Sequence, residues 1–223
     1  MWQCKVVGIM NLLTKTDIIN KLQTYSTTSD DDVLRCKAKI KESLIMCPEL
    51  LYLLNNKDLE SELFDEDGNL NASYDEDGVL IPEGEWDRYF DYNIRPYTFI
   101  EEVQAHADNF LCYTVSFSDT PRYNESECYL QIIFTIYCSI VPEQVTDDLI
   151  GASRCDLIAS ILREKFAWSN IFGTRCKLVS NQEKITDSTF VTRQLVFQAT
   201  VPNSQVVTPY NGKSGMINHR IRK

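Results

Sequence analysis

Alternating apolar and polar positions in the second half of the chain predict β-strands that are buried on one face. The clearest stretch is residues 128–140, where the apolar face consists of Leu130, Ile132, Phe134, Ile136, Cys138 and Ile140. A preceding strand places Leu111, Tyr113, Val115 and Phe117 on one face. A third strand begins at Cys176, and a last strand over residues 190–201 has an inner face of Leu195, Phe197, Ala199 and Val201.

Between the second and third of these strands the apolar spacing becomes that of a helix. Pro142 ends the strand, and Thr146, followed by two aspartates, is the predicted N-cap of a helix over residues 146–167. Its predicted apolar stripe is Ile150, Leu157, Ile158, Ile161, Leu162 and Phe166, whereas Arg154, Asp156, Arg163 and Glu164 are expected to face away. Residues 118–127 and 181–188 are predicted polar loops.

The pattern therefore predicts an α+β fold. Residues 98–202 would form an antiparallel four-stranded sheet with an amphipathic helix packed on one face. Residues 1–55 are predicted to be an N-terminal helical segment, in which Thr14 or Thr16 caps a first helix and Pro48 begins a third. The apolar positions of the first helix are Ile18, Ile19, Leu22 and Tyr25.

Residues 56–97 are predicted to be an acidic, turn-rich insert or arm. Asp65-Glu66-Asp67-Gly68 recurs as Asp75-Glu76-Asp77-Gly78, and each Asp-Gly pair is a strong turn signal. A small hairpin or an extended arm fits this spacing. Asp65 begins a calcium-like alternation of oxygen ligands, but Leu70 stands where such a loop needs glycine, so no metal is expected.

Two groups of residues are candidate protein-contact sites. Trp86, Tyr89 and Phe90 lie in the turn-rich segment and are expected either to face a partner or to anchor the segment to its own domain. The opposite face of the second strand carries Tyr129, Gln131, Ile133, Thr135 and Tyr137. This face is mixed but uncharged, which fits contact with another protein or with a second packing layer from the N-terminal helices.

The charges are unevenly distributed along the sequence. The chain of 223 residues has a net charge of −10, which argues against a general nucleic-acid coat. No acid follows Asp187, and the chain ends with Arg220, Arg222 and Lys223. Residues 203–223 are therefore expected to be an extended, basic C-terminal arm that contacts a neighbouring subunit.

No motif for catalysis or cofactor binding is present in the sequence. The eight cysteines contain no C-x-x-C pair and only two histidines occur, so zinc is not expected. Phosphate-binding, dinucleotide-binding and nucleophile motifs are missing. We expect no cofactor, no enzymatic activity, no membrane span and cysteines that remain reduced.

The order of elements resembles that of the tail terminator proteins of long-tailed bacteriophages. The resemblance covers residues 98–202 and is carried by FLCYTVSF, CYLQIIFTIYCSIVPEQVTDDL, RCDLIASILREKF, RCKLVSNQEKI and FVTRQLVFQATVPN. It implies a homo-oligomeric ring, usually six-fold, that ends the tail tube and joins it to the head–tail connector. DNA would pass only transiently through its lumen. The protein would be in the virion neck or tail, after assembly in the host cytoplasm.

The helical and acidic N-terminal part and the basic tail depart from that family pattern. One alternative is therefore another head-completion, connector or baseplate adaptor protein. A different alternative is a cytosolic small-ligand-binding or enzymatic α+β domain, which would need a pocket lined by residues such as Tyr129, Tyr137 and His106.

Overall fold

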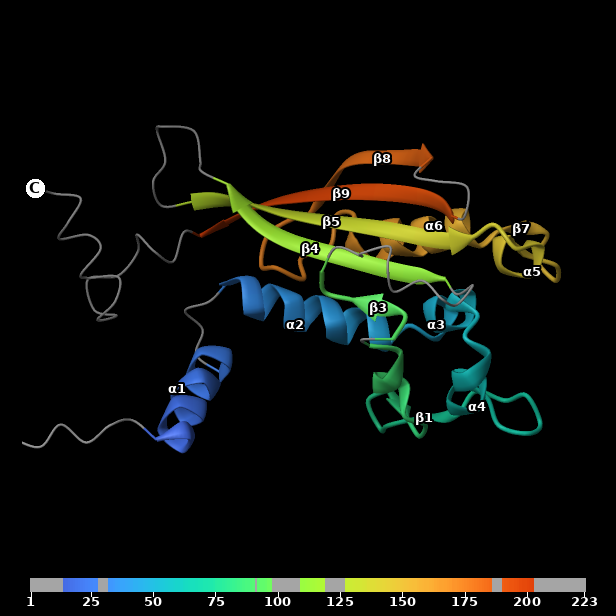
Figure 1. Cartoon of the computed structure of the whole chain (residues 1–223), viewed down its shortest axis with the longest axis horizontal. Coiled ribbons are helices and arrows are strands. Elements are labelled where there is room, and N and C mark those ends of the chain that lie inside the picture. The colour runs from blue at the N-terminus through green and yellow to red at the C-terminus, as the bar shows by residue number, and fades with distance from the viewer. Residues whose placement is uncertain are drawn as a thin grey trace, which may run out of the picture.

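A computed structural model of the 223-residue chain describes residues 14–27, 32–90, 92–97, 109–118, 127–185 and 190–202 (Figure 1). Its helices are α1 (Lys15–Thr27), α2 (Asp32–Ile45), α3 (Pro48–Leu54), α4 (Glu60–Leu63), α5 (Pro142–Val145) and α6 (Arg154–Phe166), with 3-10 turns η1 (Lys57–Leu59) and η2 (Trp86–Tyr89). Its strands are β1 (Ala72–Tyr74), β2 (Leu80–Pro82), β3 (Ile94–Arg95), β4 (Phe110–Ser118), β5 (Glu127–Ser139), β6 (Thr146–Asp147), β7 (Ala152–Ser153), β8 (Lys177–Ile185) and β9 (Phe190–Pro202). The fold is α+β.

The main sheet is mixed and five-stranded, with the order β3-β4-β5-β9-β8. Its four long strands are antiparallel, as the sequence predicts. The prediction of only four strands is wrong, because β3 pairs in parallel with β4. This strand has two residues, too few to show a period, and is held by the buried Ile94 and by the Leu111 N–H, which donates to the Asn93 carbonyl at 2.8 Å.

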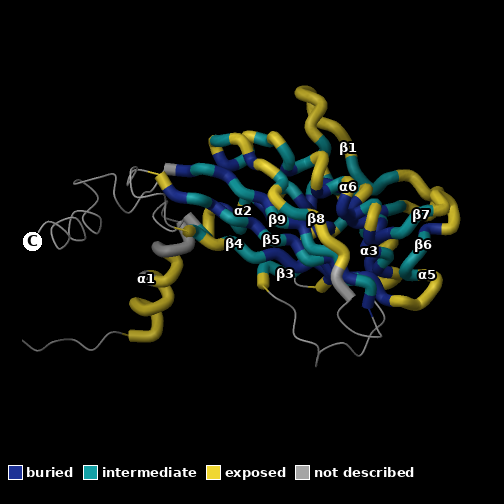
Figure 2. The backbone as a smooth tube through the Cα atoms, turned by 90° about the horizontal axis from the view of Figure 1, so that it is seen from above, coloured by how far each residue is buried: buried dark blue, intermediate teal, exposed yellow. Residues whose placement is uncertain are grey.

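One face of the sheet, here called the inner face, carries the core. The central residue is Phe134, whose ring centroid lies 4.9 Å from that of Phe166 on α6 and 5.7 Å from that of Phe197 on β9. Helices α2 and α6 pack on this side, so the amphipathic helix covers the predicted face. The same core cluster includes Trp86 and Tyr89, and the turn-rich segment therefore shares a core with the sheet. Figure 2 shows this buried layer running the length of the sheet.

The predicted start of the long helix is wrong. Thr146 does not cap a helix, because Thr146–Asp147 pairs with Ala152–Ser153 as a small hairpin and α6 begins only at Arg154. Gly151 takes a φ of +68°, which interrupts helical geometry. Two further positions differ from the prediction as a consequence: Arg154 is buried and Ile150 is exposed.

Strand ends also differ from the pattern. Strand β5 stops at Ser139, so Ile140 does not join the inner face and is exposed. The predicted loop over residues 181–188 is strand up to Ile185, because β8 pairs with β9 along this stretch despite its polar sequence. The remainder of that loop, residues 186–188, lies outside the described residues.

Both predicted Asp-Gly turns are present, and the second closes the β1–β2 hairpin. The Asp75 carboxylate accepts the N–H groups of Asp77 and Val79, at 2.9 and 2.8 Å. Gly84, just after the hairpin, leaves no room for a side chain, since a Cβ there would lie 2.0 Å from the Glu62 carbonyl oxygen. The chain just after the hairpin thus packs closely against α4.

The N-terminal helices follow their predicted signals. Pro48 is the first residue of α3. Thr14, rather than Thr16, caps α1: its hydroxyl accepts the Asp17 N–H at 3.2 Å and the Asp17 carboxylate accepts the Thr14 N–H at 2.9 Å. The hydrogen bonds that the Thr14 hydroxyl and the Thr14 N–H donate to the Asp17 carboxylate lower the pKa of Asp17. Within the described ranges, no helix is long and apolar enough to cross a membrane.

Candidate functional site

The face of the sheet opposite α6, here called the outer face, contains the predicted contact residues. Strand alternation and register place five rows across β4, β5 and β9: Ser118–Tyr129–Thr200, Ser116–Gln131–Gln198, Thr114–Ile133–Val196, Cys112–Thr135–Gln194 and Phe110–Tyr137–Thr192. The five predicted residues of β5 are therefore the middle column of one continuous surface, and each is half-buried.

None of the residues in these rows carries a charge, although 24% of the chain is Asp, Glu, Lys or Arg. At one end Phe110, Cys112 and Phe190 form a small buried cluster with Tyr137 packed against it. The Arg95 guanidinium lies 4.9 Å from the centre of the Phe110 ring. Beyond this cluster the surface consists of the Tyr129 ring and of hydroxyl, amide and aliphatic groups.

The expected second packing layer from the N-terminal helices is not on this side. Helix α2 lies along the inner face, where the Tyr113 hydroxyl donates to the Lys37 carbonyl at 3.2 Å, and α3 packs on α6. Among the described elements, α2 and α3 thus add to the core and leave the outer face to other contacts.

Trp86 and Tyr89 are anchors within their own chain. The Trp86 indole N–H donates to the Glu62 carbonyl at 2.9 Å, and the Tyr89 hydroxyl donates to the Leu59 carbonyl at 3.1 Å. Burial raises the pKa of Tyr89 to about 12. Both side chains are buried, so they offer no surface to a partner, whereas Phe90 is half-buried beneath the Lys41 ammonium group. Arg220, Arg222, Lys223 and His106 lie outside the described residues.

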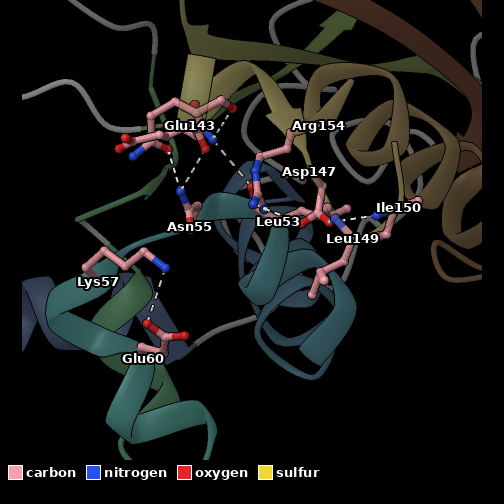
Figure 3. Close-up of polar contacts among 11 residues, drawn as sticks. Leu53, Asn55, Lys57, Glu60, Glu143, Asp147, Leu149, Ile150 and Arg154 are labelled. Atoms are coloured by element: carbon pink, nitrogen blue, oxygen red, sulfur yellow. Dashed lines mark hydrogen bonds and ion pairs between the residues drawn. The ribbon is translucent and has the colours of Figure 1, made fainter. Parts of the chain in front are cut away.

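A buried ion pair stands where the sequence suggested a helix cap. Arg154 Nη2 lies 2.9 Å from Asp147 Oδ2, and Figure 3 shows the two side chains pointing toward each other. Asp147 Oδ1 also accepts the N–H groups of Leu149 and Ile150, each at 3.1 Å. The Arg154 guanidinium carbon lies 5.6 Å from the centre of the Tyr52 ring. This pair fixes a hairpin whose tip residue Leu149 is 91% exposed.

Next to this hairpin an apolar groove of about 590 Å³ opens between α3 and α6. Its lining residues are Pro48, Glu49, Tyr52, Leu53, Phe64, Leu70, Ile150, Leu157, Ser160, Ile161 and Glu164. Glu49 and Glu164 are its charged lining residues, and both are exposed. Burial, followed by the hydrogen bond with Asp147, raises the pKa of Tyr52. The groove lacks converging polar groups, so its chemistry suits an apolar occupant.

A chain of buried asparagines joins the N-terminal segment to the sheet. Asn56 Nδ2 donates to Asn93 Oδ1 at 2.7 Å, and Asn93 Nδ2 donates to the Asn109 carbonyl at 2.9 Å. Asn109 Nδ2 in turn donates to the Gln144 carbonyl at 3.2 Å. These contacts satisfy buried backbone groups at the start of β4, which is a structural role.

Seven cysteine thiols are buried within the described residues. Burial raises the pKa of both Cys47 and Cys176 to about 11. The Cys138 thiol donates a hydrogen bond that lowers the pKa of Cys155, and the same hydrogen bond raises the pKa of Cys138. No group of three or more His, Cys, Asp or Glu residues in the described part of the chain is arranged to hold a metal ion.

Iodoacetamide at pH 8 is therefore expected to leave these thiols unmodified in the native protein and to alkylate them in urea, because the reactive thiolate requires both access and deprotonation. Peptide mass mapping measures the modification at each cysteine. Rapid native alkylation of Cys47 or Cys176 would contradict their burial. The thiols concerned are Cys36, Cys47, Cys112, Cys128, Cys138, Cys155 and Cys176.

Comparison with known protein families indicates the origin of this chain. The profile of the YomW family matches residues 48–199, which is more than half of the chain. The chain belongs to the YomW family. This family is phage-derived, of the SPBeta prophage type. No curated protein matches the chain. The YomW match runs from the first residue of α3 into β9, so it includes the groove and all of the outer face except Thr200, and excludes α1 and α2.

Family membership confirms the phage origin that the tail-terminator resemblance implies. It identifies the YomW-family chain as a phage protein without specifying a tail terminator.

Proposed function

We propose that this YomW-family chain is a non-enzymatic structural subunit of the phage neck, similar to a tail terminator. Copies of the chain form a homo-oligomeric ring that ends the tail tube and joins it to the head–tail connector. The observation that carries this proposal is the outer face, an uncharged surface across the three central strands of the sheet.

A sheet face that remains in water normally carries charged side chains, since these oppose association. The cores of protein interfaces show the opposite composition, being depleted of charge and enriched in tyrosine. The middle column of the outer face, from Tyr129 to Tyr137, matches that second composition. We therefore assign the outer face to the contact between subunits.

The charge balance fits the passage of DNA through such a ring. A net charge of −10 makes the protein repel the phosphate backbone on average. DNA in the lumen is then a transient occupant rather than a ligand, and the tail tube and the head–tail connector are the lasting partners.

A single lysine on the outer face tests this assignment. Ile133→Lys places a charge at the centre of the face and is expected to abolish the ring, because an unpaired charge buried in an interface is costly. Tyr74→Lys, on the exposed β1 hairpin, is the matched control and is expected to assemble like the wild type. Native mass spectrometry and electron microscopy, with and without tail tube, measure the assembly state.

A wild-type protein that stays monomeric, even when mixed with tail tube, would contradict the ring. Rings that form equally well from Ile133→Lys would leave the ring in place and remove the outer face as its interface.

A second candidate is another head-completion, connector or baseplate adaptor, and one observation favours it. Helices α1 and α2 lie outside the matched range, so a sizeable helical part is added to the common body. Locating the protein in a virion map separates this candidate from the tail terminator.

A further inference from the structure

Helix α1 presents an apolar stripe that its own chain leaves in water. Ile18, Ile19 and Leu22 are 48%, 42% and 60% exposed. Figures 1 and 2 both show α1 standing apart from the sheet and from the helices that cover it. Spacings of i, i+1 and i+4 put these three side chains on one side of the helix, in the arrangement by which amphipathic helices dock into grooves.

The apolar groove between α3 and α6 has the complementary chemistry. Its walls are aliphatic and aromatic, and it is open to solvent. Helices α1 and α6 each have 13 residues, so each is about 20 Å long. The groove residues of α6 run from Leu157 to Glu164, about two helical turns, and the apolar stripe of α1 from Ile18 to Leu22 spans about one turn, so the stripe fits along the groove.

The charges of the two surfaces are also complementary. The groove has Glu49 on the α3 side and Glu164 on the α6 side. Helix α1 carries Lys15 and Lys21 against one acid, Asp17, whose carboxylate is already bonded to Thr14. A helix with a net positive charge thus meets a groove whose charged lining residues are both acidic.

We propose that α1 of one copy of this chain docks into the α3–α6 groove of a second copy. Docking into its own groove is disfavoured, because α2 stands between them: its 14 residues span about 21 Å, and α1 and α3 lie at its two ends (Figure 1). Two different surfaces meet in such a contact, which makes it heterologous, and heterologous contacts generate rings when the rotation closes. The inference rests on the proposed self-assembly and adds a second contact between subunits, beside the one through the outer face.

Complementation between two single variants of the full chain tests the docking. Leu22→Asp disables α1 and keeps the groove, whereas Leu157→Asp keeps α1 and disables the groove. Each variant alone is expected to self-associate at least about tenfold more weakly than the wild type, because the loss of one anchor side chain weakens binding by about tenfold. Sedimentation velocity measures this association. A mixture of the two is expected to give a heterodimer, because the intact α1 of Leu157→Asp can dock into the intact groove of Leu22→Asp.

Two controls keep the result specific. Leu34→Asp, at another exposed leucine on α2, is expected to assemble like the wild type. Glu164→Lys, on an exposed residue of the groove, is expected to weaken association without affecting the fold, and Lys15→Glu in the partner copy is expected to recover it. Circular dichroism checks that Leu157→Asp remains folded.

Unchanged assembly of both Leu22→Asp and Glu164→Lys would overturn the docking, while the neck ring would still stand or fall on the assembly state of the wild-type protein with tail tube. A mixture that fails to restore association would overturn the docking of α1 on a second copy. A wild-type chain without self-association at any concentration would overturn the docking as well.

Discussion

Phe134→Ala is expected to lower the free energy of unfolding by about 3–5 kcal/mol, the range for deleting a buried ring. Phe134 is fully buried at the centre of the inner face. Its ring contacts Phe166 on α6, Phe197 on β9 and Tyr113 on β4, with a centroid distance to Tyr113 of 6.1 Å. Removing the ring leaves a cavity between the helix and three strands, which the tightly packed surroundings fill only in part.

Urea denaturation monitored by circular dichroism measures this loss. Phe117→Ala is the matched control, because Phe117 lies near the end of β4 and is only partly buried, so its effect is expected to be smaller. If Phe134→Ala does not fold, Phe134→Leu keeps most of the volume and is expected to cost less than about 1.5 kcal/mol. A loss below about 1 kcal/mol for Phe134→Ala would be inconsistent with a packed core at this position.

Asp147→Ala is expected to destabilise the protein by about 3–5 kcal/mol, the cost of leaving one partner of a buried pair uncompensated. The two side chains are 1% and 8% exposed, so Arg154 has little access to water once Asp147 is removed. The substitution also removes the acceptor for two backbone N–H groups of the hairpin. Arg154 Nε and Nη1 have no hydrogen-bond partner among the described residues, which makes the pair costly to keep.

The double variant Asp147→Ala/Arg154→Met distinguishes a buried pair from two independent residues. It is expected to be more stable than Asp147→Ala alone, because an apolar side chain needs no counter-charge. Glu60→Ala breaks the exposed pair with Lys57 and is expected to change the free energy of unfolding by less than about 1 kcal/mol. Strictly additive effects of the Asp147 and Arg154 substitutions, measured in the same urea experiment, would argue against the pair.

The sequence predicts the elements whose pattern is local and long. Strand β5 has an apolar side chain on the inner face at every second position from Leu130 to Cys138, a period that fits a strand and not a helix. The Thr146-Asp147 signal fails for a physical reason: an aspartate that can cap a helix can also close a turn. Here Asp147 closes the turn because a buried arginine seven residues later binds its second oxygen.

The candidate sites, too, could be predicted from the sequence only where their pattern is local. The uncharged column from Tyr129 to Tyr137 is visible in one strand, but its continuation across β4 and β9 depends on register, which a single strand does not reveal. The groove could not be predicted, since its walls come from segments more than a hundred residues apart, as Pro48 and Glu164 illustrate. For Trp86 and Tyr89 the sequence allowed two interpretations, contact with a partner or an anchor within the chain. Their hydrogen-bond acceptors, the Glu62 and Leu59 carbonyls, are backbone atoms, which the sequence pattern does not reveal.

Strand β8 has a consequence for the size of any assembly. It is the outermost strand of the sheet, and its pairing with β9 is interrupted by a register shift between Leu178 and Ser180. Lys177 and Glu183 add charge to the same edge. Bulges and charges on an edge strand oppose the addition of a further strand from another molecule. At this edge the sheet is thus protected against open-ended growth into fibres, which is consistent with the proposed contacts through the outer face and α1.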